Sequence, residues 1–151
     1  MGNVVVKQAG IQDIDDLALL FDGYRQFYGR ESSIEDAVNF LLARINNKES
    51  VIFIAYLNDK PAGFTQLYPS FSSLSVARTF ILNDLYVAPE ARRNAVATHL
   101  MDAAKGYAKS VGAIKLTLST EVTNHAAQFL YENQGWNKDD NFLVYQFFFQ
   151  E

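Results

Sequence analysis

Apolar residues recur along the first third of this chain at spacings that separate strands from helices. A short β-rich run at residues 3–8 is followed by two stretches, residues 11–28 and 34–47, in which apolar side chains return every three or four positions. This spacing predicts one short strand and two amphipathic helices. Ser32 or Ser33 is suited to cap the second helix, because a serine oxygen accepts a hydrogen bond from the first helical turn.

The rest of the chain alternates β-rich runs with helical spacing. In chain order the pattern predicts a hairpin at residues 51–71, a strand at 77–87, a helix at 90–112, a strand at 113–119, a helix at 124–136 and a strand at 142–149. The segment from residue 80 to residue 119 is then a right-handed crossover between parallel strands. We therefore expect a mixed α/β fold, with a mixed, mostly antiparallel sheet and helices on both of its faces.

Length and composition indicate one globular domain. The chain has 151 residues, of which 49% are hydrophobic and 20% are charged, and no repeat or linker-like segment divides it. We therefore treat residues 1–151 as a single domain. The first residues lack the features of a leader peptide, and no apolar run approaches the roughly 18 residues that span a bilayer. A cytoplasmic protein without membrane contact is expected.

Charge and missing residue types exclude several classes of function. The formal net charge of -4 argues against a nucleic-acid partner. The chain contains no cysteine, which excludes disulfides and covalent cysteine catalysis, and only two histidines, which makes a metal site improbable. Its glycines fit neither of the usual patterns that hold dinucleotides or nucleoside triphosphates.

A predicted strand, Pro89 and a predicted helix follow one another in the stretch "NDLYVAPEARRNAVATHL" at residues 83–100. Free backbone N–H groups at such a helix start form an anion site, and Arg92 and Arg93 add positive charge. Ala95 and Ala97 are small, which allows a ligand to approach the backbone. The alternative is that two arginines simply open an exposed helix. Basic residues are unfavourable there without an anion, so the anion site is the better interpretation.

Two motifs together resemble the GNAT superfamily of N-acetyltransferases over residues 53–149. The first is "LNDLYVAPEARRNAVATHLMDAAKGYAKSVGA", and the second is "NHAAQFLYENQGW". They are similar to the family's strand, V-x-P and [RQ]-x-x-G-x-[GA] pattern and to its later N-x-x-A-x-x-[LF]-Y-x-x-x-G-[FW] pattern. The resemblance implies the acyl-CoA N-acyltransferase fold and the use of acetyl-CoA as co-substrate. The first 50 residues match the family's acceptor-binding helices in order only.

The resemblance also assigns the site of the acyl donor. It implies that backbone amides at residues 92–98 hold the CoA pyrophosphate, and that the strand edge at residues 85–87 pairs with the pantetheine arm. The residues assigned in this way are Leu85, Tyr86, Val87, Arg92, Arg93, Asn94, Ala95, Val96, Ala97 and Thr98. Arg93 and Ala95 stand where the family commonly has glycines, which bears on the affinity for CoA rather than on its location.

The second motif supplies two further residues. The resemblance implies that Asn124 faces the CoA arm, and that Tyr131 contacts the thioester sulfur and acts as the general acid. Asn124, Ala127 and Tyr131 share one face of a helix, which agrees with these roles. The alternatives are that Tyr131 is a packed core aromatic, and that Asn124 is a residue of the first turn with Thr123 as the cap.

Asn83 and Asp84 are poor strand formers inside the apolar run "FILNDLYV". A turn would explain them but would split a strand. Similar sequences in the polyamine acetyltransferase branch of the superfamily have an acidic pair facing the amine. Here Asn83 takes the place of the glutamate, so Asp84 is the first candidate for the general base, acting through water. Tyr86 or a water relay is the alternative.

The acceptor site is expected in the first helix, the loop after it and the hairpin. The candidate substrate-binding residues are Tyr24, Tyr28, Asn83 and Asp84, and their neighbours Arg25, Phe27, Glu31, Tyr68 and Phe71 lie in the same region. Aromatic and acidic residues together suit a polyamine or a lysine-like amine, although core packing explains the aromatics equally well. Arg25 and Arg30 could instead bind the carboxylate of an amino acid. A protein or peptide amine remains an alternative acceptor.

With no cysteine available, the expected mechanism is direct attack of the neutral amine on acetyl-CoA in a ternary complex. A backbone N–H at residues 85–87 would stabilise the oxyanion. The competing hypothesis is a non-catalytic acyl-CoA-binding module, which Asn83 and the alanines of the loop favour slightly. The strand predicted at residues 142–149 is too hydrophobic for an open edge, so it should be central or paired across a homodimer.

Overall fold

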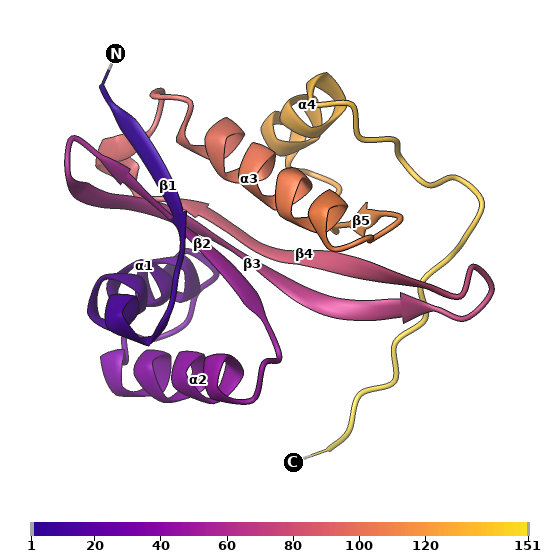
Figure 1. Ribbon diagram of the computed structural model, residues 1–151, viewed down its shortest axis with the longest axis horizontal. Helices are drawn as coiled ribbons and strands as arrows, with labels where there is room; N and C mark the ends of the chain where they lie inside the picture. Colours follow the sequence, from indigo (N-terminus) through magenta and orange to yellow (C-terminus); the bar gives the residue numbers. More distant parts are fainter. Residues whose placement is uncertain (1, 151) are drawn as a thin grey trace. The chain divides into compact units, whose positions relative to one another are not determined.

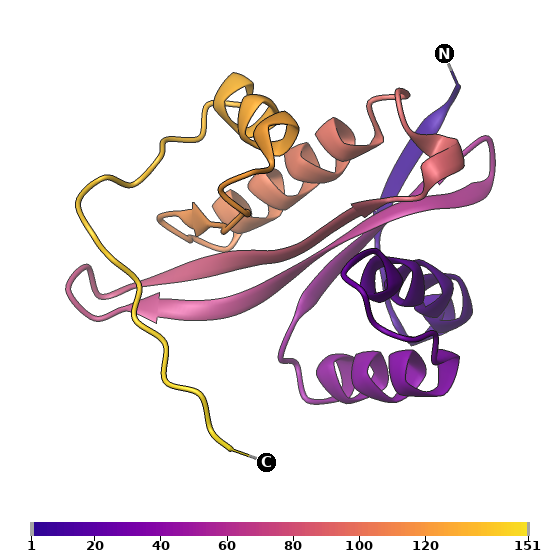
Figure 2. The ribbon, with the colours of Figure 1, turned by 180° about the vertical axis from the view of Figure 1, so that it is seen from behind.

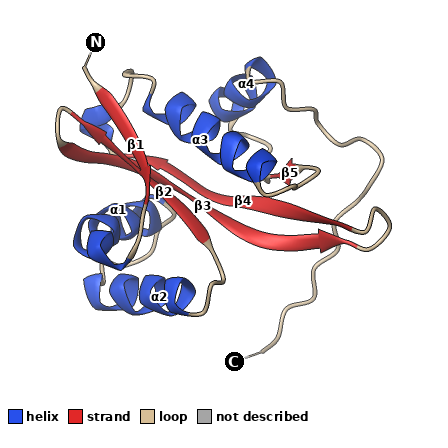
Figure 3. Ribbon diagram, in the orientation of Figure 1, coloured by secondary structure: helices blue, strands red, loops and turns tan. Residues whose placement is uncertain are grey.

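Five strands form one mixed sheet in the computed structural model, which describes residues 2–150 (Figure 3). The strands are β1 (Val4–Gln8), β2 (Val51–Leu57), β3 (Lys60–Ser72), β4 (Ala77–Val87) and β5 (Leu116–Thr117). They lie in the order β1-β2-β3-β4-β5, and every pair is antiparallel except β4 and β5. The predicted mixed, mostly antiparallel sheet with a parallel crossover is confirmed.

Helices cover both faces of this sheet, as predicted. The helices are α1 (Ile14–Phe27), α2 (Ile34–Asn46), α3 (Val96–Ser110) and α4 (His125–Asn133), with short 3₁₀ turns η1 (Ile11–Asp13) and η2 (Pro89–Ala91). Figures 1 and 2 show α1 and α2 on one face of the sheet and α3 on the other. Ser33 caps α2, since its Oγ accepts from the Asp36 N–H at 3.2 Å. No helix in the described part of the chain is long and apolar enough to cross a membrane.

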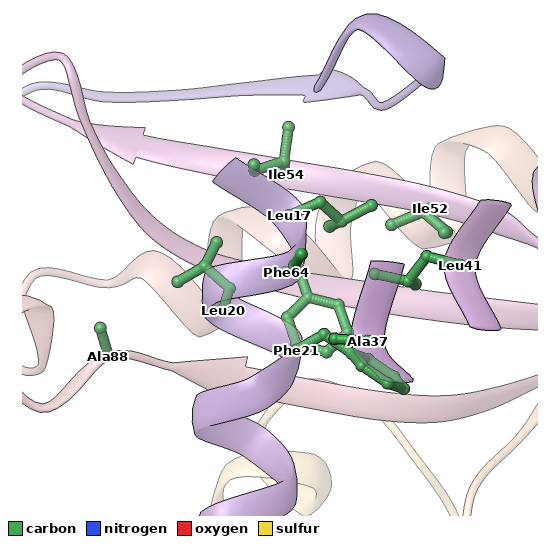
Figure 4. Close-up of a cluster of buried hydrophobic side chains, with 10 residues drawn as sticks. Leu17, Leu20, Phe21, Ala37, Leu41, Ile52, Ile54, Phe64 and Ala88 are labelled. Atoms are coloured by element: carbon green, nitrogen blue, oxygen red, sulfur yellow. The ribbon is translucent and has the colours of Figure 1, made fainter. Parts of the chain in front are cut away.

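Side chains from alternate positions of the strands build the core on each face. Figure 4 shows the cluster beneath α1 and α2, which consists of Leu17, Ala18, Leu20, Phe21, Ala37, Leu41, Ile52, Ile54, Phe64 and Ala88. On the opposite face, the rings of Phe53 and Phe80 lie 5.9 and 5.7 Å from the ring of Tyr107 in α3. This alternation fixes which residues of β3 and β4 face α1 and which face α3.

The helix predicted at residues 90–112 is shorter than expected. The α-helix begins only at Val96, because Arg93 and Ala95 both adopt left-handed backbone conformations, with φ of 66° and 60°. A left-handed residue cannot continue a right-handed helix. The C-terminal stop near Gly112 was predicted correctly, and this glycine has a φ of 81°.

The chain divides into two units, Met1–Ser119 and Thr120–Glu151. The second unit contains α4, and in its described residues 134–150 form neither helix nor strand. The strand predicted at residues 142–149 is therefore wrong, and the strand predicted at 113–119 shrinks to Leu116–Thr117. A continuous apolar run lacks the alternation that identifies a strand paired on one face. The single domain and the homodimer expected from the sequence stay predictions.

Candidate active site

A β-bulge lies in β4 at Asn83. Asp84 pairs with Gln66 of β3, whereas Leu82 pairs with the next β3 residue, Leu67, so that Asn83 is an extra residue without a partner. The strand nevertheless continues from Ala77 to Val87. The turn considered from the sequence is therefore wrong, and the bulge accounts for a poor strand former at this position.

The bulge exchanges the faces of the sheet to which alternate β4 residues point. Before it, Phe80 contacts α3, as described above; after it, the ring of Tyr86 lies 6.4 Å from the ring of Tyr24 in α1. Asp84 precedes Tyr86 by two residues and therefore faces α1 as well. In an uninterrupted strand, the parity of Phe80 would have placed Asp84 beneath α3.

Asp84 is a buried carboxylate on this face of the sheet, with 2% of its surface exposed. Gln66 Nε2 donates to Asp84 Oδ2 at 2.6 Å, and Asn83 Nδ2 donates to Asp84 Oδ1 at 2.7 Å. The Tyr24 hydroxyl also lies near enough to act on this carboxylate. Burial raises the pKa of Asp84, and these three side chains act in the opposite direction. The result is a carboxylate with a proton affinity above the usual one.

A pocket of about 600 Å³ opens over Asp84 between α1, α2 and the sheet. It is lined by Phe21, Tyr24, Arg25, Tyr28, Arg30, Asp36, Asn39, Phe40, Tyr68, Asn83 and Asp84. All four predicted substrate-binding residues are thus brought together, with Arg25, Arg30 and Tyr68. Phe27, Glu31 and Phe71 do not line this pocket. Phe21 of α1 and three residues of α2, Asp36, Asn39 and Phe40, were not predicted to line it. The α2 residues could have been found, because their spacing of three and four positions marks one helix face.

The tyrosines around Asp84 are held in the protonated form. Burial and the nearby Asp84 charge raise the pKa of Tyr68 to about 12, and burial also raises the pKa of Tyr24. Burial likewise raises the pKa of Tyr86, the alternative base considered from the sequence. A phenol with a raised pKa is a poor proton acceptor near neutral pH. Asp84 is therefore the better candidate for a base in this pocket.

An open strand edge lies on the far side of β4 from β3. Ala88 N–H donates to Ala62 O at 2.8 Å, so the alternation of an antiparallel ladder turns the peptide groups of Val87 and Leu85 away from β3. Val87 O accepts from Arg92 Nε at 3.2 Å. Within the described residues, β5 pairs with β4 only at Phe80 and Ile81. The edge at residues 85–87 is therefore available to an extended ligand, with Leu85 and Val87 facing outward and Tyr86 paired to β3.

The loop at residues 92–95 leads into the N-terminus of α3. The Asn94 side chain stabilises the conformation of this loop, because its Nδ2 donates to Ala91 O at 3.2 Å and to Arg92 O at 3.0 Å. Arg93 and Ala95 occupy the left-handed region without being glycine. These are the two positions at which the sequence departs from the glycines of the resembling pattern, so the backbone itself explains why glycine is favoured there.

The N-terminus of α3 presents free N–H groups next to these arginines. The first hydrogen bond of the helix runs from His99 N–H to Ala95 O at 3.1 Å, so the N–H groups of Val96, Ala97 and Thr98 precede it. The first turn of α3 contains no acidic residue. Together with the exposed guanidiniums of Arg92 and Arg93, this arrangement suits a phosphate-bearing ligand.

Replacing Ala95 by glycine is expected to raise the free energy of unfolding by up to about 1 kcal/mol, because glycine adopts a positive φ without the Cβ clash. Urea unfolding would measure the change. Ala103→Gly is the matched control, since this residue lies within α3, where glycine should destabilise by about 1 kcal/mol. Equal losses in both variants would contradict the proposed strain at Ala95.

Asn124 and Tyr131 belong to the second unit. Asn124 caps α4 itself, since its Oδ1 accepts from the Ala127 N–H at 3.1 Å, so Thr123 is not the cap. Tyr131 follows on the same helix, and its ring lies 6.2 Å from the ring of Trp136. The roles assigned to Asn124 and Tyr131 stay predictions. Among residues 2–150, no group of three or more histidine and carboxylate side chains is placed to hold a metal ion.

The known proteins that this chain resembles are acetyltransferases. Residues 17–136 match the model of the Acetyltransferase (GNAT) family. An uncharacterized N-acetyltransferase, YhfO, of Bacillus subtilis (strain 168) is 48% identical over 140 residues, 93% of this chain and 94% of that protein. A thialysine N-epsilon-acetyltransferase of Caenorhabditis elegans is 29% identical over 107 residues, 71% of this chain and 66% of that protein. The crystal structure of a probable acetyltransferase has a TM-score of 0.92 and 46% identity, and the match covers 97% of this chain and 99% of that one.

Proposed function

This chain belongs to the GNAT family of acetyltransferases, and from that premise we propose that it transfers the acetyl group of acetyl-CoA to a primary amine of a small molecule. The observation that carries the proposal is the pocket of about 600 Å³ with a buried carboxylate at its base. Its size suits a small molecule rather than a folded protein. The relative that is named for thialysine and the "NDLYV" stretch support an amino-acid-like or polyamine acceptor.

Acetyl-CoA is proposed to bind along the open edge of β4 and at the start of α3. The outward peptide groups of Leu85 and Val87 would pair with the pantetheine arm as a strand partner does. The N–H groups at residues 93–98 would receive the pyrophosphate, and Arg92 and Arg93 would add positive charge. Asn124 of the second unit would face the same arm.

The proposed reaction is a direct acetyl transfer within a ternary complex. A bound ammonium loses a proton to Asp84 through water, because only the neutral amine is nucleophilic. The nitrogen lone pair then attacks the thioester carbon, and the N–H of Leu85 or Val87 stabilises the oxyanion. The C–S bond breaks as the amide forms, and Tyr131 donates a proton to the departing thiolate. The proton that the attacking nitrogen loses then restores the Tyr131 hydroxyl through water. No covalent enzyme intermediate is required.

Tyr131→Phe is expected to lower kcat about 100-fold, because it removes the proton donor for the thiolate. The dissociation constant of acetyl-CoA should change little, since the ring remains. Steady-state kinetics and equilibrium binding would be measured for this variant and for Tyr145→Phe, a matched control whose side chain is exposed in the same unit. Full turnover by Tyr131→Phe would remove this residue from the mechanism.

Asn83→Ala is expected to shift the acidic limb of the kcat/KM profile to higher pH. The Asn83 amide donates to Asp84 and lowers the pKa of that carboxyl group, so its loss should make the carboxylate protonate at a higher pH. Asn39→Ala is the control, because this pocket amide is not one of the three partners of Asp84. A limb that stays in place, or moves to lower pH, would show that another group titrates.

Thiol release from acetyl-CoA across a panel of amines tests the proposal. Turnover on small primary amines is the expected result. Binding of CoA without turnover on any amine would favour the non-catalytic acyl-CoA-binding module. Turnover on peptide amines alone would favour a protein or peptide acceptor, and the absence of CoA binding would refute the proposal altogether.

A further inference from the structure

The wall of the acceptor pocket carries an unusual set of charges for a site that receives an ammonium. Besides Asp84, its charged lining residues are Arg25, Arg30 and Asp36. The wall above Asp84 thus carries two positive guanidiniums and one negative carboxylate. A second ammonium, as in a polyamine, would lie against these guanidiniums and be repelled.

The two arginines are brought together by the end of α1. Gly29 adopts a φ of 85°, its N–H donates to Gln26 O at 2.9 Å, and Arg30 N–H donates to Arg25 O at 3.0 Å. These two bonds form a Schellman motif, which folds the chain back so that the backbones of Arg25 and Arg30 meet. The conformation of this helix end therefore brings Arg25 and Arg30 close together.

Buried Asp22 ties the segment after this motif to α1. With 4% of its surface exposed, it accepts from Gln26 Nε2 at 2.9 Å, from Ser32 Oγ at 2.7 Å and from Ser33 N–H at 2.8 Å. Its oxygens are thus occupied by neutral donors. The segment that carries Arg30 is held at both ends, by Arg25 O and by Asp22.

Among residues 2–150, neither guanidinium lies within 4.0 Å of a carboxylate oxygen. In the part of the chain that the structure describes, the ion pairs within 4.0 Å are Lys7 with Asp13, Arg44 with Glu49 and Lys138 with Asp140. Arg25 acts on Asp22 only through a weaker Coulombic attraction. The planar guanidinium can donate two parallel hydrogen bonds to a carboxylate. Arg25 and Arg30 both border the pocket without such a carboxylate partner among the described residues.

We propose that the acceptor is an amino-acid-like amine, whose carboxylate binds Arg25 and Arg30 while the amine to be acetylated faces Asp84. This proposal rests on the proposed function and selects among its acceptors. A carboxylate bound there offsets the charge of the guanidiniums, and Asp36 supplies one further negative charge on the wall, so a free ammonium is accommodated beside such a carboxylate but not in its absence. The two arginines are then specificity-determining residues, and Asp84 is the group that meets the reacting nitrogen.

Pairs of amines that differ only in a carboxylate provide the test. The probes are L-lysine with cadaverine, L-ornithine with putrescine, and 5-aminovalerate with butylamine. Equilibrium binding is measured by titration calorimetry and kcat/KM by thiol release from acetyl-CoA. In at least one pair, we expect the carboxylated amine to bind at least 10-fold more tightly and to have the higher kcat/KM.

The variants Arg25→Ala and Arg30→Ala should remove this preference. We expect each to raise KM for the carboxylated amine at least 10-fold, with little change in kcat, and to leave or improve kcat/KM for its partner. Arg25→Lys and Arg30→Lys should restore part of the loss. Arg78→Ala is the matched control, because this exposed arginine of β4 lies outside the pocket lining. CoA binding by all variants should match that of the wild type.

The outcomes separate this inference from the proposed function. Equal or tighter binding of the amines without a carboxylate, or equal effects of the arginine variants on both members of each pair, would overturn the inference even where acetylation occurs. The wild type could prefer the carboxylated amines in binding, and the arginine variants could lose that preference, while no amine is acetylated. This result would uphold the carboxylate site and refute the proposed acetyl transfer.

Discussion

Asp84→Asn is expected to lower kcat by about 100-fold to 10,000-fold, the range that a positioned general base contributes. The substitution keeps the size of the side chain but removes its ability to accept a proton. Steady-state thiol release at saturating acetyl-CoA and amine would measure the loss. Since Asp84 lies in the acceptor pocket, away from the loop at the start of α3, binding of CoA should be unchanged.

The pH profile distinguishes a base from a residue that only shapes the pocket. Below its pKa, Asp84 carries a proton and cannot take one from the ammonium, so activity should fall as the pH decreases through that pKa. Burial raises the pKa of Asp84, which places this acidic limb above the range of an ordinary aspartate. A variant Asp84→Asn that retains both its activity and its acidic limb would exclude Asp84 as the base.

Gly63→Ala is expected to destabilise the protein by about 2 to 3 kcal/mol, the range of an overpacked core position. A Cβ at Gly63 would lie 2.6 Å from Tyr86 O, 3.2 Å from Val96 Cγ1 and 3.3 Å from Leu100 Cδ1. The closest of these atoms belongs to the backbone of β4, which cannot swing away as a flexible side chain does. Either β4 or the first turn of α3 must move.

Gly106→Ala is the matched control for this prediction. Gly106 lies in α3, and a Cβ there would meet nothing within 4 Å, so alanine should stabilise the helix by up to about 1 kcal/mol. Urea unfolding of the two variants would give changes of opposite sign. A neutral result for Gly63→Ala would mean that β3 packs less closely against β4 and α3 than the distances indicate.

Much of the fold follows from local patterns in the sequence. The helices α1 and α2, the hairpin of β2 and β3, and strand β4 were predicted within a few residues, because their apolar periodicity is regular and their ends carry suitable residues such as Ser33. The family implied by the two motifs is confirmed as well. The acceptor pocket was partly predicted, since Tyr24 and Asp84 were both identified as lining residues.

Three features could not be predicted, each because it depends on partners distant in sequence or on unfavourable local conformations. The bulge at Asn83 is defined only by the pairing of β4 with β3. The left-handed Arg93 and Ala95 carry no glycine that would signal a positive φ, so the helix was expected to begin too early. The apolar run at residues 142–149 has the composition of a strand but no alternation that fixes a pairing.

Because of the bulge at Asn83, the register between β3 and β4 decides whether the Asp84 carboxylate faces the pocket. If the bulge were lost and the residues after it slipped by one, the neutral amide of Asn83 would lie opposite Gln66, and Asp84 would turn to the face covered by α3. Thr65 opposes this slip, because its Oγ1 donates to Asp84 O at 2.8 Å in the buried interior. A molecule in the slipped register would have no base in its pocket, so the specific activity of a preparation would depend on the pairing of β3 with β4 as well as on protein concentration.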